Sequence, residues 1–162
     1  MRNELRKQSR GELWDFRRNH CMVSDNGQSS SANSPGIEKY GMIGAEGFAR
    51  LIGAFYRQVP QDDLLGPMYP AQDLPGAEQR LRDFLIGRFG GPQTYIEQRG
   101  HPRLRARHSP FPINQTVRDR WMRLMNSAFE EAALPGEAEQ VLRKFLDGMS
   151  SFMINQVEPR VR

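Results

Sequence analysis

The 162-residue sequence has little cysteine and no long apolar run, and each shortage excludes a class of protein. Cys21 is its only cysteine, so neither an internal disulfide nor a cysteine-based metal site is possible. The apolar run at residues 51–56 is bounded by arginines and is far shorter than the roughly 20 residues of a membrane helix. Residues 1–20 carry charges throughout, unlike a secretory signal. We therefore expect a soluble, cytoplasmic protein without a membrane partner.

Catalytic motifs are also scarce. The three histidines are His20, His101 and His108, and none accompanies a recognisable serine or cysteine nucleophile motif. No glycine-rich phosphate loop is present, and the eight methionines fall at helical spacing, typical of core residues. The net charge of +4 comes from bases interspersed with acids, which does not favour a nucleic-acid partner. The exception is residues 99–107, where four arginines occur without an acid.

The composition divides the chain into three parts. Residues 1–39 are rich in Ser, Asn, Arg and Gly, and such a segment buries too little apolar area to offset the entropy of ordering, so we predict a disordered extension. Residues 40–157 hold most of the apolar side chains and are expected to form one domain. Residues 158–162 are expected to be a short tail.

Within the predicted domain, apolar residues recur at intervals of three and four, which indicates four amphipathic helices. Pro60 is expected to end the first, Gly90-Gly91-Pro92 the second and Pro135-Gly136 the third, with Asn114 capping the start of the third. No window alternates with a period of two, so the predicted fold class is all-α. The four stripes are Phe48, Leu51, Ile52, Phe55, Tyr56 and Val59; Ala77, Leu81, Phe84, Leu85 and Phe89; Val117, Trp121, Leu124, Met125, Ala128 and Ala132; and Ala138, Val141, Leu142, Phe145, Leu146, Met149, Phe152 and Met153.

The connection at residues 90–113 is long for a compact domain, and such loops are usually functional or carry short helices of their own. One helical turn there would put Leu104 and His108 on the same inward face. A single inward histidine is more often a hydrogen-bonded core residue than a ligand. Tyr56 and Trp121 also lie on core-facing stripes, and their polar hydrogens need either backbone carbonyls or a bound ligand as partners.

Many of these positions together resemble the group II truncated haemoglobins in order and spacing. The resemblance covers roughly residues 41–156 and is most specific in the arginine-rich block before His108 and in the distant tyrosines and tryptophan. The matching positions are Gly44, Phe55-Tyr56, Tyr69-Pro70, Leu74, Gly76-Ala77-Glu78, Arg80-Leu81-Arg82, Phe84-Leu85, Gly90-Gly91-Pro92, the run at 99–107, His108, Pro110-Phe111, Ile113, Arg118-Asp119 and Trp121.

The resemblance implies a globin-like, two-over-two helical sandwich that holds haem b. It assigns His108 as the proximal ligand of the iron, with its second ring nitrogen expected to bond a backbone carbonyl. Arg80 and Arg107 match positions near the haem propionates, which suits the affinity of arginine for carboxylates. The remaining cofactor contacts that it implies are Tyr69, Leu81, Phe84 and Trp121, and the distal ligand-binding residues are Tyr56, Tyr69, Trp121, Ala77 and Leu81.

Three functions remain open at this stage. The first, implied by the resemblance, is reversible binding of oxygen and other diatomics such as NO and CO, with slow release because of the distal hydrogen bonds. The second is a haem redox enzyme, a nitric-oxide dioxygenase or a peroxidase-like protein, which would need an external reductase. The third is a cofactor-free helical module whose basic loop binds an acidic partner. The expected oligomeric state is a monomer or a homodimer.

Overall fold

The computed structural model describes residues 35–157, and all regular structure in that range is helical. The predictions for residues 1–34 and 158–162 lie outside the described residues. The α-helices are α1 (Pro35–Gln58), α2 (Leu74–Arg88), α3 (Thr94–Arg99), α4 (Leu104–His108), α5 (Gln115–Ala132) and α6 (Gly136–Phe152). Three short 3-10 helices, η1 (Val59–Gln61), η2 (Gly66–Met68) and η3 (Ala71–Asp73), connect α1 to α2.

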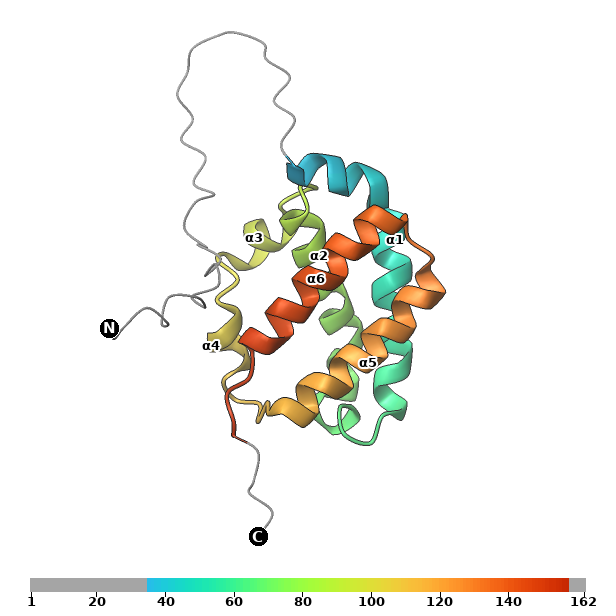
Figure 1. Cartoon of the computed structure of the whole chain (residues 1–162). Coiled ribbons are helices and arrows are strands. Elements are labelled where there is room, and N and C mark those ends of the chain that lie inside the picture. The colour runs from blue at the N-terminus through green and yellow to red at the C-terminus, as the bar shows by residue number, and fades with distance from the viewer. Residues whose placement is uncertain (1–34, 158–162) are drawn as a thin grey trace, which may run out of the picture. The chain divides into compact units, whose positions relative to one another are not determined.

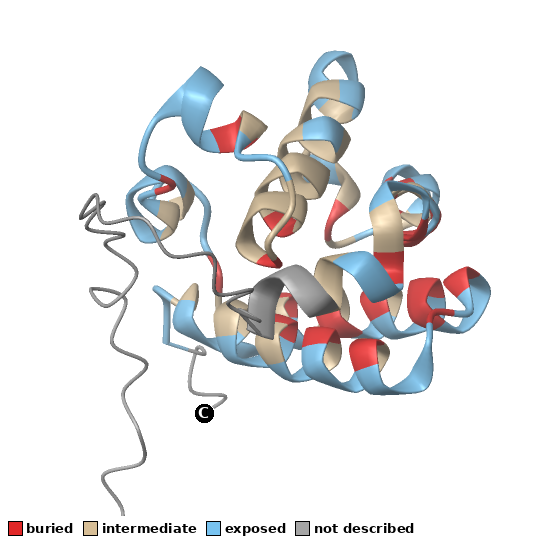
Figure 2. Cartoon of the chain, turned by 90° about the horizontal axis from the view of Figure 1, so that it is seen from above, coloured by how far each residue is buried: buried red, intermediate tan, exposed pale blue. Residues whose placement is uncertain are grey.

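The four long helices form two layers, which confirms the predicted all-α two-over-two sandwich. Helices α5 and α6 make one layer and α1 and α2 the other (Figure 1). Helix α1 contacts both α2 and α5, and α5 also contacts α6. Buried and exposed positions alternate around α5 and α6, as amphipathic helices require (Figure 2). No helix among the described residues is long and apolar enough to cross a membrane.

Helix α1 has two arms that meet at Gly44. The backbone there has φ 68° and ψ 165°, a conformation open essentially to glycine alone. The first arm begins at Pro35, so the predicted extension at residues 1–39 overlaps the start of the helix. The second arm carries the predicted stripe, in which Phe48, Leu51 and Phe55 are among the fully buried side chains. The glycine thus lets the chain change direction before the core begins.

The boundaries of α5 agree with the sequence at one end and differ at the other. The Asn114 side chain accepts a hydrogen bond from the Val117 backbone N–H at 2.9 Å, which confirms the predicted cap. The prediction that Pro135-Gly136 closes α5 is wrong. Helix α5 ends at Ala132, Ala133 adopts the left-handed conformation with φ 47°, and Pro135 is the N-cap of α6.

Two positions of the predicted α6 stripe are also wrong. Val141 is 39% exposed and Phe152 is 53% exposed, so neither belongs to the core. The guanidinium of Arg105 lies 5.2 Å from the centre of the Phe152 ring, so this aromatic face is partly covered by a cation. The predicted stripe of α5 was incomplete, because Met122 and Phe129 of that helix are also buried.

The long connection carries two short helices. Helix α4 confirms the predicted turn around His108, whereas α3 was not predicted at all. Gly90, with φ 96°, lies two residues after the end of α2. Gly100, with φ 68°, caps the C-terminus of α3. These short elements line the edge of the sandwich where the candidate site lies (Figure 1).

Candidate functional site

A cavity of about 750 Å³ lies among the helices and the connection that carries α3 and α4. Its size is within the roughly 300–1,000 Å³ usual for small-molecule and cofactor pockets. All nine residues that the sequence assigned to the site line this one cavity. They are Tyr56, Tyr69, Ala77, Arg80, Leu81, Phe84, Arg107, His108 and Trp121.

His108 is the last residue of α4 and is half-buried. Its Nδ1 lies 2.7 Å from the backbone carbonyl oxygen of Leu104, one helical turn earlier. A carbonyl can only accept, so Nδ1 carries the proton and donates it, and Nε2 keeps its lone pair. The expected bond from the second ring nitrogen to a backbone carbonyl is thereby confirmed. The result is an imidazole with a fixed orientation, whose Nε2 lone pair is free to bind a metal.

Helix α2 forms one apolar wall of the cavity. Ala77, Leu81 and Phe84 are only half-buried although they form the predicted inward stripe, because this face meets the cavity as well as the core. Phe145 and Met149 of α6 supply further apolar lining. A cavity with such walls favours a large apolar ligand, whose burial stabilises both partners.

Tyr56, Tyr69 and Trp121 supply a polar cluster on another wall. The two tyrosine rings meet edge to face with centroids 5.8 Å apart, and the Trp121 ring packs 5.1 Å from that of Phe55. Burial raises the pKa of Tyr56 far above its ordinary value, with a further contribution from Tyr69. Burial also raises the pKa of Tyr69, against a hydrogen bond from Trp121 that lowers it. Both hydroxyls therefore stay protonated at neutral pH and can donate.

The Tyr56 hydroxyl has no hydrogen-bond partner among the described residues, and it is not sealed in the core. The residue is buried and its ring is held by Phe55 and Tyr69, yet the side chain lines the cavity. A hydroxyl that opens onto a cavity can bond to water or to a ligand there. This hydroxyl is thus available to donate to a polar ligand atom inside the cavity.

The charged residues of the cavity are four arginines and one carboxylate, Asp73. Arg80 forms a bidentate pair with Asp73, and the Arg107 guanidinium donates to the carbonyls of Pro102 and Arg99 at 2.9 and 3.1 Å. Each therefore uses two of its five N–H groups and retains others. The excess of positive charge suits a ligand with carboxylate groups.

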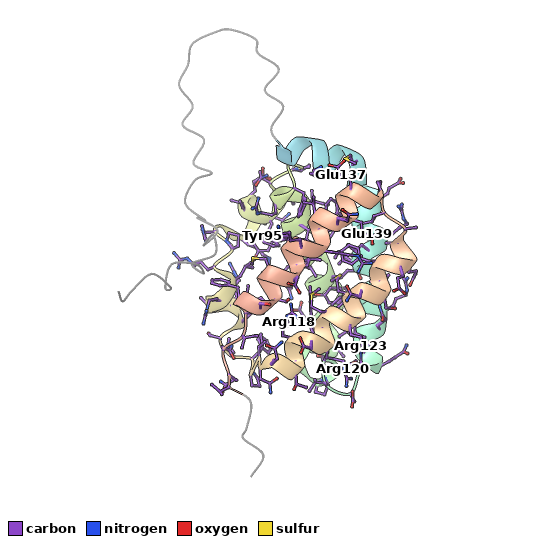
Figure 3. The ribbon with its side chains drawn as sticks, viewed as in Figure 1. Tyr95, Arg118, Arg120, Arg123, Glu137 and Glu139 are labelled. Atoms are coloured by element: carbon purple, nitrogen blue, oxygen red, sulfur yellow. The ribbon has the colours of Figure 1, made fainter. Side chains whose placement is uncertain are left out.

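The cavity is also lined by residues that the sequence did not assign to the site, among them Tyr95 of α3, Arg99 at the end of α3, and Arg118 of α5. Tyr95 packs edge to face on Phe84 with centroids 5.7 Å apart. Arg118 pairs with Asp119 and with an aspartate of α6, and its buried Nε has no partner. Figure 3 places Tyr95 between α3 and α6 and Arg118 between α5 and α6. Arg99 and Arg118 appeared in the basic cluster and in the resemblance, but Tyr95 gave no signal.

These features together fit haem. The free Nε2 of His108 is a suitable axial donor for haem iron, the apolar walls suit the porphyrin ring, and the arginines suit its two propionates. The unpaired Tyr56 hydroxyl suits a polar ligand atom at the iron. No residue that lines the described cavity conflicts with this fit.

Comparison with known proteins supports the same assignment. The family model for bacterial-like globins matches residues 38–155. The group 2 truncated hemoglobin YjbI of Bacillus subtilis is 38% identical over 132 residues, which cover 82% of this chain and 96% of that protein.

Solved structures agree in fold. The thermostable hemoglobin of the actinobacterium Thermobifida fusca is 46% identical with a TM-score of 0.70, covering 78% of this chain and 100% of that one. The truncated oxygen-avid haemoglobin of Bacillus subtilis is 38% identical with a TM-score of 0.69, covering 72% and 98%. The chain is therefore a haem-binding globin that belongs to the bacterial-like globin family and, within it, to the group II truncated haemoglobins.

Proposed function

We propose that this chain holds haem b through His108 and uses it to capture oxygen, with NO and CO as further ligands, and that it releases oxygen slowly. The proposal rests on one observation: the free Nε2 of His108 and the unpaired hydroxyl of Tyr56 belong to side chains that line the same cavity. The oxygen-avid relative from Bacillus subtilis supports it. When bound, haem supplies an iron with an open coordination position for a diatomic gas.

The chain holds and orients this group with three kinds of residue. The Leu104 carbonyl keeps the His108 ring in one tautomer and one orientation, so that Nε2 faces the cavity. Leu81 and Phe84 exclude water from the ring. Arg80 and Arg107 retain N–H groups beyond those that bond Asp73 and the backbone, and these are the donors for the propionates.

The slow release follows from the polar cluster. An oxygen ligand held at the haem would carry partial negative charge, so hydrogen bonds from Tyr56, Tyr69 or Trp121 would be charge-assisted and would contribute about 1.5–3 kcal/mol each. At tenfold per about 1.4 kcal/mol, two such bonds slow the departure of the ligand by roughly two to four orders of magnitude relative to an apolar pocket. Slow release favours ligand capture over bulk oxygen delivery.

The test is spectroscopic. Haem is titrated into the purified chain, and the absorption spectrum is recorded after reduction and then after exposure to oxygen. We expect saturation at one haem per chain and a stable oxygenated spectrum, with the same result for His101→Ala, which removes another histidine of the same connection. A chain that gains no Soret band after haem is supplied would contradict the proposal. A Soret band with no change on exposure to oxygen would contradict the ligand assignment.

A further inference from the structure

The residues that directly follow α6 are hydrogen bonded to the segment that carries His108. The Asn155 side chain accepts from the Ile113 N–H at 3.0 Å and donates to the carbonyls of Phe111 and His108 at 2.9 and 3.3 Å. The backbone N–H groups of Asn155 and Gln156 both donate to the Ile113 carbonyl, at 2.8 and 3.0 Å. Five hydrogen bonds thus join two segments more than 40 residues apart.

Helix α4 needs such an external support. It has five residues, and a helix of that length is not stable on its own in water. It begins after Arg103, a non-glycine residue with φ 42°, and Pro110 and Pro112 prevent its continuation. The Arg107 side chain bonds only to carbonyls of its own connection. Asn155 therefore ties the end of α4, through the carbonyl of His108, and the residues after it to the chain that follows α6.

We propose that Asn155 is a positioning residue for His108: by holding the carbonyl of His108 and the turn after it against the end of α6, it sets where Nε2 stands in the cavity. This inference rests on the proposed function, because the position matters through the bond from Nε2 to haem iron. A metal-ligating histidine whose support is loosened binds its metal more weakly, typically by about 10- to 100-fold.

The geometry requires an amide and not a carboxylate. Asn155 uses its oxygen as an acceptor for Ile113 and its nitrogen as a donor to two carbonyls. Asn155→Asp keeps the acceptor but places an anionic oxygen against the carbonyls of His108 and Phe111. Asn155→Ala removes all three side-chain bonds and leaves the two backbone bonds in place. Comparing the two variants therefore separates the effect of the two bonds that the Asn155 nitrogen donates from the effect of the bond that its oxygen accepts.

The experiment compares these variants with two controls, all as full-length chains, loaded with haem for the first two readouts and without haem for the third. Asn126→Ala removes an exposed asparagine of α5 whose side chain accepts from Arg143 of α6 and makes no hydrogen bond to residues 104–113. Ala138→Gly loosens α6 at its opposite end and lowers stability with the Asn155 bonds intact. The readouts are the rate of haem transfer to an excess of a haem-scavenging apoglobin, the iron–histidine stretching band of the reduced protein, and amide hydrogen exchange at residues 104–113 without haem.

We expect both Asn155 variants to lose haem about tenfold faster than the parent, with a shifted or broadened iron–histidine band. Their exchange at residues 104–113 should also be faster, while both controls keep the parental band. An unchanged band and haem-loss rate in the Asn155 variants would overturn the proposal, as would equal changes in Ala138→Gly. If the parent binds no haem, the proposed function fails, and the exchange measurement still decides whether Asn155 holds α4.

Discussion

Replacing Tyr56 with phenylalanine removes one oxygen atom from the cavity and leaves the ring in place. The ring packs against Phe55 and Tyr69 with centroids 5.2 and 5.8 Å away, and these contacts do not involve the hydroxyl. The hydroxyl has no protein partner among the described residues, so its loss leaves no other group unsatisfied. One charge-assisted hydrogen bond of about 1.5–3 kcal/mol corresponds to oxygen release that is roughly 10- to 100-fold faster.

The assay is stopped-flow displacement of oxygen from the reduced protein. Tyr40→Phe is the matched control, because Tyr40 stacks on Phe48 with centroids 6.3 Å apart and does not line the cavity. The same displacement with CO provides an internal comparison, since CO gathers less charge and should respond less. If Tyr56→Phe releases oxygen at the parental rate, Tyr56 makes no bond to the ligand and the reasoning from its unpaired hydroxyl is refuted.

Two further predictions concern the fold. Gly44→Ala places a Cβ on a backbone with φ 68° and ψ 165°, and it should lower the free energy of unfolding by on the order of 1–3 kcal/mol, measured by thermal or urea unfolding; no change would show that the two arms of α1 do not need this conformation. Burial is the largest single effect on the pKa of Asp62 and raises it, but the hydrogen bonds from Arg120, Leu65 and Leu64 together outweigh burial, so the pKa lies below its ordinary value. A lowered folded-state pKa stabilises the fold above the unfolded value of 3.8, and that contribution disappears as the pH falls through the folded value. Urea unfolding should therefore show that the stability lost in Asp62→Asn is largest near pH 7 and shrinks below about pH 4; a loss that is constant from pH 7 to pH 3 would contradict the assignment.

The long helices could be predicted because their signals are local. Spacings of three and four marked each buried face, and Asn114 marked the start of α5. The signal failed where a helix end depends on its neighbours: α5 ends at Ala132, before the left-handed Ala133, and not at Pro135-Gly136. It failed also at Phe152, where the periodicity continues past the point at which α6 leaves the core.

Part of the site could also be predicted, because its signals are local in the sequence. The nine predicted residues among those that line the cavity came from the stripes and from the family resemblance, and both depend on the order of residues along the chain. The contributions of Tyr95 and Asn155 depend on how distant segments meet, which no spacing encodes. Arg80 shows the limit in energetic terms. The resemblance placed Arg80 near the propionates, and the structure adds that Arg80 already forms an ion pair with Asp73.

The most direct test of the central claim replaces His108 with glycine and supplies imidazole in solution. We expect the variant to lose the parental spectrum of the reduced haem protein and to regain it when free imidazole occupies the space left by the side chain. His101→Gly, the matched control, should keep the parental spectrum without any addition. If His108→Gly shows the parental spectrum in the absence of imidazole, then His108 is not the iron ligand and the account is wrong.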